Sequence, residues 1–426
     1  MKFRFALSFR PLLFFWVVVF FIVEISDWVL PFDARGQSFS SCLIYYSVFF
    51  AVFVFFSLLA IPKFYATINF GSVGRLQKVL NWFFLISFLS LVAVFFDRVY
   101  IQGVSYSNGI AQARESWRAM ASSRDGASSI INVLGNLLFP FCFFVFALSY
   151  SFFESLIKPK LYLYGSVLLI FLFSVLTGGR ELLLILCAIA ASSACLRISI
   201  NAPLLPKKIR LETIFFVALV LGFSLYVGFL RSQSYSDGLS WYSNSLAERL
   251  GGVKSSEFVQ DSFVSPIAMP VLIYLAHVKW VFINVIDGGL EGGLSTFRQI
   301  FILFDRYTFF SDDVVGFSSP KYSPNWISAI GSFYYDFDFF GLVLCIAGVF
   351  ILWFTALGFL RVCELSRCFF SVFYFYVVCS VIIMMPFAFM FEIVQFIYLC
   401  IPLMLTLFWG FLVSFQGRSD YEFRVH

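Results

Sequence analysis

Long apolar runs separated by short polar segments dominate the sequence. Ten of these runs approach the length of about 20 residues that an α-helix needs to cross a bilayer. The predicted spans lie at 12–31, 42–62, 79–96, 131–151, 161–178, 182–200, 213–230, 338–358, 369–390 and 392–414. The pattern predicts an all-α polytopic membrane protein in which residues 1–426 form a single integral membrane domain.

Composition supports this class and excludes several others. Hydrophobic residues make up 61% of the 426 residues and charged residues only 12%, whereas a soluble globule has about a quarter of its residues charged. The net charge of +5 is too small to argue for nucleic acid, and no glycine-rich nucleotide loop is present. The nine cysteines lie outside the long polar segments, so we expect no disulfide framework in those segments. No histidine lies near the cysteines, so we expect no metal site, and we also expect no cofactor.

The first apolar run follows a basic head, Met1–Arg10, as in a signal peptide. However, Glu24 and Asp27 follow it without a small-residue cleavage site, so we expect a retained first helix.

The distribution of Lys and Arg predicts the orientation. With the N-terminus in the cytoplasm, the inner segments carry sixteen of these residues and the short outer loops carry two, Arg35 and Arg180. This bias predicts that both termini are cytoplasmic.

Two predicted outer segments are long, 97–130 and 231–337, and we expect short helices in both. The second contains an apolar stretch near 268–286 that His277 and Lys279 interrupt. If this stretch crossed the membrane, every later loop would change sides and the inner bias would be lost. We therefore expect an interfacial or partly inserted helix.

Arg180 occupies an unusual position in the tight outer turn Thr177-Gly-Gly-Arg-Glu181. Its charge opposes the dipole at the start of the next helix and also the positive-inside trend. A helix N-terminus together with a guanidinium suits a phosphate group. The alternative is a contact with Glu181 or with lipid headgroups.

Other outer arginines are candidates for binding a diphosphate or a glycan. Arg231 ends span seven, where snorkelling is an adequate alternative explanation. Arg114 and Arg118 share a helical face beside Trp117, which also suits an interfacial helix. Arg98 follows Asp97 and is expected to pair with it.

Three residues are candidates for a general base. His277 is the only histidine besides the final residue, and a neutral imidazole is a common base. Asp336 and Asp338 lie among aromatic residues at the entry to span eight, where Asp338 is also placed to cap the helix. Glu24, Asp27 and Glu392 are expected either to pair with arginines or to lie at the interface.

Taken together, these segments resemble the Wzy-type O-antigen polymerases. The resemblance rests on the arginine-bearing loop after the third span, the turn Leu176-Thr-Gly-Gly-Arg-Glu181, the long loop opened by Arg231, and Phe333-Tyr-Tyr-Asp-Phe-Asp-Phe-Phe-Gly341. The last segment departs from the family's aromatic-Asp-Phe-Gly pattern, because two phenylalanines separate Asp338 from the glycine. The family position of the aspartate therefore stays open between Asp336 and Asp338.

The resemblance implies a metal-independent glycosyltransferase of the bacterial inner membrane. It would act at the periplasmic face on oligosaccharide repeats carried by undecaprenyl diphosphate, with the arginines contacting diphosphate or glycan. The implied partners are this lipid-linked oligosaccharide, membrane lipid and a chain-length regulator protein, and not nucleic acid.

Two other functions compete with this hypothesis. An O-antigen ligase would use the same donor, and a prominent loop histidine such as His277 favours it. A lipid-linked sugar flippase or transporter would be expected to carry charged pairs or broken helices within its spans. The apparent collection of charge at the outer rim favours surface chemistry.

Overall fold

The computed structural model describes residues 2–35, 37–107, 109, 112–113, 116–117, 129–177, 179, 181–206, 218, 222, 238–254, 268–288, 327–361 and 368–410. This part of the chain is almost entirely helical, with two short two-stranded sheets. Eight of its helical stretches are long and apolar enough to cross a membrane. An all-α polytopic membrane protein is thus confirmed, whereas the count of ten crossings stays a prediction. Apart from 218 and 222, predicted span 213–230 lies outside the described residues.

The N-terminal helices lie close to the predicted spans. They are α1 (Arg10–Val29), α2 (Phe39–Leu59), α3 (Val73–Phe96), α7 (Pro159–Thr177) and α8 (Glu181–Ser199). Between α3 and α7, the predicted span 131–151 consists of two helices, α5 (Ile130–Leu138) and α6 (Phe141–Ser151). Pro140 separates them, because proline lacks the N–H that would continue the helix.

The C-terminal helices differ more from the prediction. Helix α13 (Ala329–Arg361) begins more than two turns before the predicted span. Helix α14 (Cys368–Met384) ends before the predicted residue 390, just ahead of Pro386. A short turn, η5 (Met390–Glu392), then leads to α15 (Val394–Ile397), which opens the apolar stretch Val394–Gly410.

Helix α14 forms the centre of the molecule. All of its residues except Tyr374 are buried, and Phe373 stacks on Phe144 of α6 with ring centroids 4.0 Å apart. Ser380 meets Ser192 of α8 at 2.8 Å. Small hydroxyl residues permit such close helix approach within a membrane.

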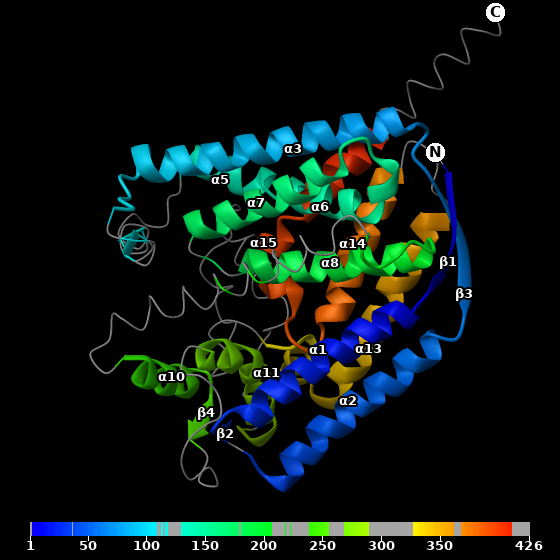
Figure 1. The fold of residues 1–426 in the computed structure, drawn as a ribbon. Coiled ribbons are helices and arrows are strands. Elements are labelled where there is room, and N and C mark those ends of the chain that lie inside the picture. Colours follow the sequence, from blue (N-terminus) through cyan, green and yellow to red (C-terminus); the bar gives the residue numbers. More distant parts are fainter. Residues whose placement is uncertain are drawn as a thin grey trace, which may run out of the picture.

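A two-stranded sheet, which the apolar pattern did not predict, joins segments at one end of the molecule. Strand β1 (Lys2–Ser8) pairs with β3 (Lys63–Asn69) in antiparallel register, from Lys2 opposite Asn69 to Ser8 opposite Lys63. Figure 1 shows β1 and β3 on one side of the molecule, and β2 (Phe32–Ala34) with β4 (Gly252–Lys254) on the opposite side.

Several predicted inner segments meet at the β1–β3 end. Phe3 of β1 contacts Phe152 at 4.9 Å between ring centroids, and Phe70 contacts Phe369 at 5.3 Å. The guanidinium of Arg361 lies 5.1 Å from the ring of Phe64. The structure thus brings these segments together, while the prediction that this end faces the cytoplasm is not tested by it.

Helix α11 (Met269–Gly288) contains the predicted interfacial segment. Strand β4 precedes it and pairs with β2 directly after α1. Near the end of α11, the Asn284 amide donates to the carbonyl of Gly251 at 3.0 Å, and Ser38 donates to Asp287 at 3.3 Å. Strand β4 and the end of α11 therefore lie at the same end of the molecule. Because Met269–Asp287 is one of the eight stretches long and apolar enough to cross a membrane, the interfacial placement of α11 stays a prediction.

Candidate functional site

Arg98 lies where helix α3 changes into a π-helical turn, η1 (Asp97–Ile101). Only 4% of Arg98 is exposed. Its guanidinium donates to the carbonyl oxygen of Leu176 at 2.7 Å and lies 4.4 Å from the ring centre of Trp117. The Tyr106 hydroxyl donates to the same carbonyl at 2.9 Å. Arg98 thus connects the first predicted outer loop with the end of α7.

Asp97, which is fully buried, closes the base of that loop. Its two carboxylate oxygens accept hydrogen bonds from Gln102 and from Ser129, the residue before α5. Asp97 was expected to pair with Arg98. In the structure Asp97 accepts instead from these neutral donors, and Arg98 donates to a backbone carbonyl. Asp97 therefore joins the two ends of the loop.

A cluster of charged side chains joins α1 to α11. The ammonium group of Lys279 lies 2.8 Å from Glu24 and 2.7 Å from Asp27. Tyr45 and Tyr46 of α2 donate to the two Glu24 oxygens at 2.9 and 2.8 Å. We call these five residues the α1–α11 cluster; the indole of Trp280 also donates to Asp27, at 2.6 Å. Glu24 and Asp27 were expected to pair with arginines or to lie at the interface, and their cationic partner is Lys279.

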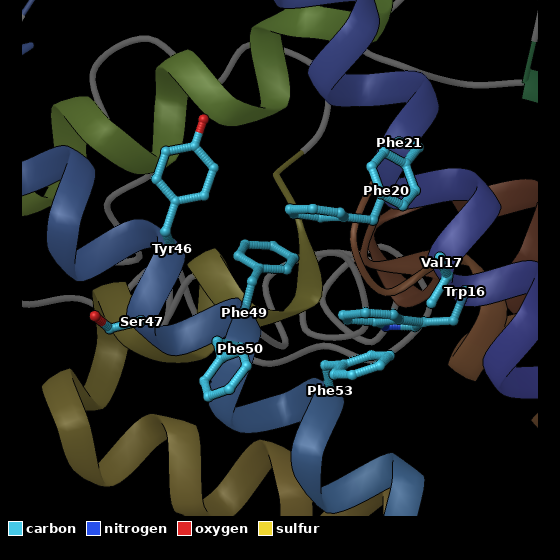
Figure 2. A pocket seen from close by; sticks show the side chains of 9 residues that line it. All are labelled: Trp16, Val17, Phe20, Phe21, Tyr46, Ser47, Phe49, Phe50 and Phe53. Carbon is cyan, nitrogen blue, oxygen red and sulfur yellow. The ribbon is translucent and has the colours of Figure 1, made fainter.

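An apolar groove of about 600 Å³ begins beside this cluster, between α1 and α2. Figure 2 shows aromatic side chains of the two helices extending toward each other. Tyr46 lines the groove and also belongs to the α1–α11 cluster. The remaining lining residues are Trp16, Val17, Phe20, Phe21, Ser47, Phe49, Phe50 and Phe53.

His277 is fully buried on α11. Its Nδ1 lies 2.7 Å from the carbonyl oxygen of Tyr274. Because a carbonyl only accepts, this bond requires the proton to be on Nδ1. The neutral ring then has its lone pair on Nε2, which is the form that a general base needs.

Asp338 interrupts helix α13 with φ 54° and ψ −141°. This conformation is costly for any residue with a side chain and is typical of glycine. A Cβ at Gly341 would lie 1.9 Å from the carbonyl oxygen of Phe333, so the break requires glycine there.

The other acidic candidates lie on or near the same helix. Asp336 is half-buried in the turn before the break. Glu392 accepts from the backbone N–H of Ile327 and from the Ser332 hydroxyl, both at 3.3 Å. Glu392 therefore stabilises the start of α13.

The structure brings some of the candidates near one another. Helices α11 and α13, which carry His277 and Asp338, touch where the Phe282 and Tyr334 rings lie 5.5 Å apart. Phe282 also contacts Tyr45 of the α1–α11 cluster, at 5.5 Å. Arg180, Arg231, Arg114 and Arg118 lie outside the described residues. Among the described residues no group of three or more His, Cys, Asp or Glu could hold a metal ion.

Two residues of these arrangements were missed from the sequence. Lys279 was treated only as an interruption of an apolar stretch, although a lysine in such a stretch signals a buried acidic partner. Nothing in the sequence indicated a role for Tyr106, because its hydrogen-bond acceptor is a carbonyl 70 residues away in sequence.

Comparison with known proteins identifies no relative of this chain. It matches no protein-family model, no curated protein and no solved structure.

Proposed function

We propose that this protein polymerises undecaprenyl-diphosphate-linked oligosaccharide repeat units at the periplasmic face of the bacterial inner membrane. A hydroxyl at the non-reducing end of a new repeat attacks the anomeric carbon of the growing chain. The glycosidic bond forms, the bond to the carrier breaks, and undecaprenyl diphosphate leaves. The hydroxyl proton passes to a base, for which His277, Asp336 and Asp338 are the candidates.

The observation that carries this proposal is the contact of Arg98 and Tyr106 with the Leu176 carbonyl. It joins the first outer loop to the turn Leu176–Glu181, two of the segments on which the family resemblance rests. Trp117, between the candidate binding residues Arg114 and Arg118, stacks on Arg98. In the proposed mechanism, the arginines of these two segments stabilise the leaving diphosphate without a metal.

The test uses the purified full chain in liposomes with synthetic undecaprenyl-diphosphate repeat units. A ladder of longer lipid-linked glycans is the expected product. Transfer of label to added lipid A core instead would identify a ligase and overturn the proposal.

A transporter of lipid-linked sugars is the second candidate, and the α1–α11 cluster favours it. Glu24, Asp27 and Lys279 form a charged group between two apolar helices, which is a feature of transport pathways. In the same liposomes, movement of labelled lipid across the bilayer without any covalent product would support this alternative.

A further inference from the structure

Helix α7 ends beside the turn that contains Arg180, and its last carbonyl groups need partners. The final four carbonyls of a helix lack intrahelical donors, and cations stabilise this negative end of the helix dipole. Leu176 lies one residue before the last residue of α7. Its carbonyl accepts from Arg98 at 2.7 Å and from Tyr106 at 2.9 Å.

We infer that Arg98 and Tyr106 are positioning residues, which cap α7 and thereby fix the turn at residues 177–181. This inference rests on the proposed function and deepens it. Arg98, which the sequence suggested as a contact for diphosphate or glycan, acts on the substrate through the turn that carries Arg180.

The surroundings of Arg98 support a fixed side chain. It is almost fully buried, and one face of its guanidinium is covered by Trp117 at 4.4 Å. Its own carbonyl accepts from the Val104 N–H at 2.9 Å, and the adjacent Asp97 accepts from Ser129 at the far end of the loop. A side chain held in this way can keep the end of α7 in a fixed position with little reorganisation.

The turn itself is linked to the end of the same helix. The Ser174 hydroxyl donates to the carbonyl of Gly179, and Thr177 donates to Phe173 at 2.8 Å. A shift at the end of α7 would therefore also move Thr177 and Gly179. Arg180 follows in the next position of the sequence.

The first experiment measures the turn without an activity assay. Gly179→Cys and Cys42→Ser are introduced into the full chain, which is studied in liposomes. A cysteine fits at position 179, because a Cβ there meets only Thr177 Oγ1, at 3.6 Å. The rate of labelling by a membrane-impermeant maleimide should rise about fivefold with Tyr106→Phe, which removes one hydrogen bond. Arg98→Ala and Arg98→Lys should raise it about tenfold or more, because a lysine cannot both stack on Trp117 and reach the carbonyl.

The matched control is Tyr100→Phe. Tyr100 lies in the same π-helical turn as Arg98 but is 70% exposed, so this variant should leave the labelling rate unchanged. An unchanged rate for both Tyr106→Phe and Arg98→Ala would overturn the inference.

The second experiment measures polymerisation kinetics with Gly179 intact. Positioning predicts that Tyr106→Phe lowers kcat about fivefold and leaves KM for the lipid-linked repeat within about twofold. A raised KM with unchanged kcat for Arg98→Lys would show direct substrate contact and would overturn the inference. If the Arg98 and Tyr106 variants are labelled faster but the wild-type protein makes no polymer, the capping role is supported and the proposed function is rejected.

Discussion

Asp338 adopts a backbone conformation that suits glycine, with φ 54° and ψ −141°. Such a conformation costs about 1–3 kcal/mol for a residue with a side chain, and Asp338 is a candidate base for the proposed reaction. The Asp338→Gly variant should therefore raise the free energy of unfolding by about 1 kcal/mol and lower polymer formation at least tenfold. Thermal unfolding in detergent and the liposome assay measure the two effects. Wild-type polymer formation by Asp338→Gly would assign the aspartate a conformational role only.

Gly341 allows the break in α13, because a Cβ there would lie 1.9 Å from the Phe333 oxygen and 2.5 Å from its carbonyl carbon. Backbone atoms cannot move aside as a side chain does, so Gly341→Ala should destabilise the protein by about 3 kcal/mol or more. Gly348 lies in the same helix with nothing within 4 Å of a Cβ. Gly348→Ala should be neutral or stabilising, and equal unfolding midpoints for the two variants would contradict this account.

His277 presents Nε2 as the basic nitrogen, because its Nδ1 bonds the Tyr274 carbonyl. A histidine base works only when neutral, and free histidine loses its proton near pH 6.5. Polymer formation should therefore rise between about pH 6 and pH 7, and His277→Asn should lose turnover while still binding the lipid-linked repeat. Asp336→Asn serves as the comparison and should keep the pH dependence. Substantial polymer from His277→Ala would reject histidine as the base.

The docking of α11 on α1 depends on an ionic group with two carboxylates and one lysine. Lys279→Met would leave both carboxylates without their cation, so it should destabilise the protein by about 3–5 kcal/mol. The triple variant Glu24→Gln, Asp27→Asn, Lys279→Met should regain most of this loss, because neutral groups do not need the ammonium. Thermal unfolding in detergent of wild type, Lys279→Met, the double variant Glu24→Gln, Asp27→Asn and the triple variant gives the coupling. A Lys279→Met protein as stable as wild type would show that the cluster does not hold α11.

Sequence alone predicts elements well where apolar runs have clear ends. Helices α1, α7 and α8 begin and end close to the predicted residues because polar residues or glycines border them. The start of α13 was missed because Asp336 and Asp338 interrupt the pattern, although the first two turns of the helix are largely buried. Strand β1 was also missed. Phe3, Phe5 and Leu7 alternate with other residues in it, but a seven-residue segment does not show which distant segment of the chain will pair with it.

The candidate site is less predictable than the fold, because it consists of contacts between distant segments. The sequence drew attention to Arg98, His277, Glu24 and Asp27, since charges are rare in this chain. It did not show that Arg98 reaches a backbone carbonyl or that Lys279 neutralises the two carboxylates. These partners depend on how helices pack, and apolar periodicity does not specify packing.

At the scale of the whole molecule, the orientation is open to a direct test. Ser107 lies in the predicted outer loop, whereas Lys158 lies at the predicted inner end beside the aromatic contacts of Phe152. In intact cells, an impermeant maleimide should label Ser107→Cys and leave Lys158→Cys unlabelled until the membrane is opened. Lys254→Cys should behave as Ser107→Cys does, because β4 pairs with the strand that follows α1. The reverse pattern would invert the topology.

The β1–β3 sheet sets an order of events during synthesis. Strand β1 is made first, yet its partner ends at Asn69, so the pairing waits until α1, α2 and the segment after them have left the ribosome. In the predicted orientation, β1 has unpaired backbone groups until then on the side where translation takes place. When the sheet forms, it joins the segment before α1 to the segment after α2. We therefore expect the α1–α2 hairpin to be stabilised by the sheet only after both helices have been inserted.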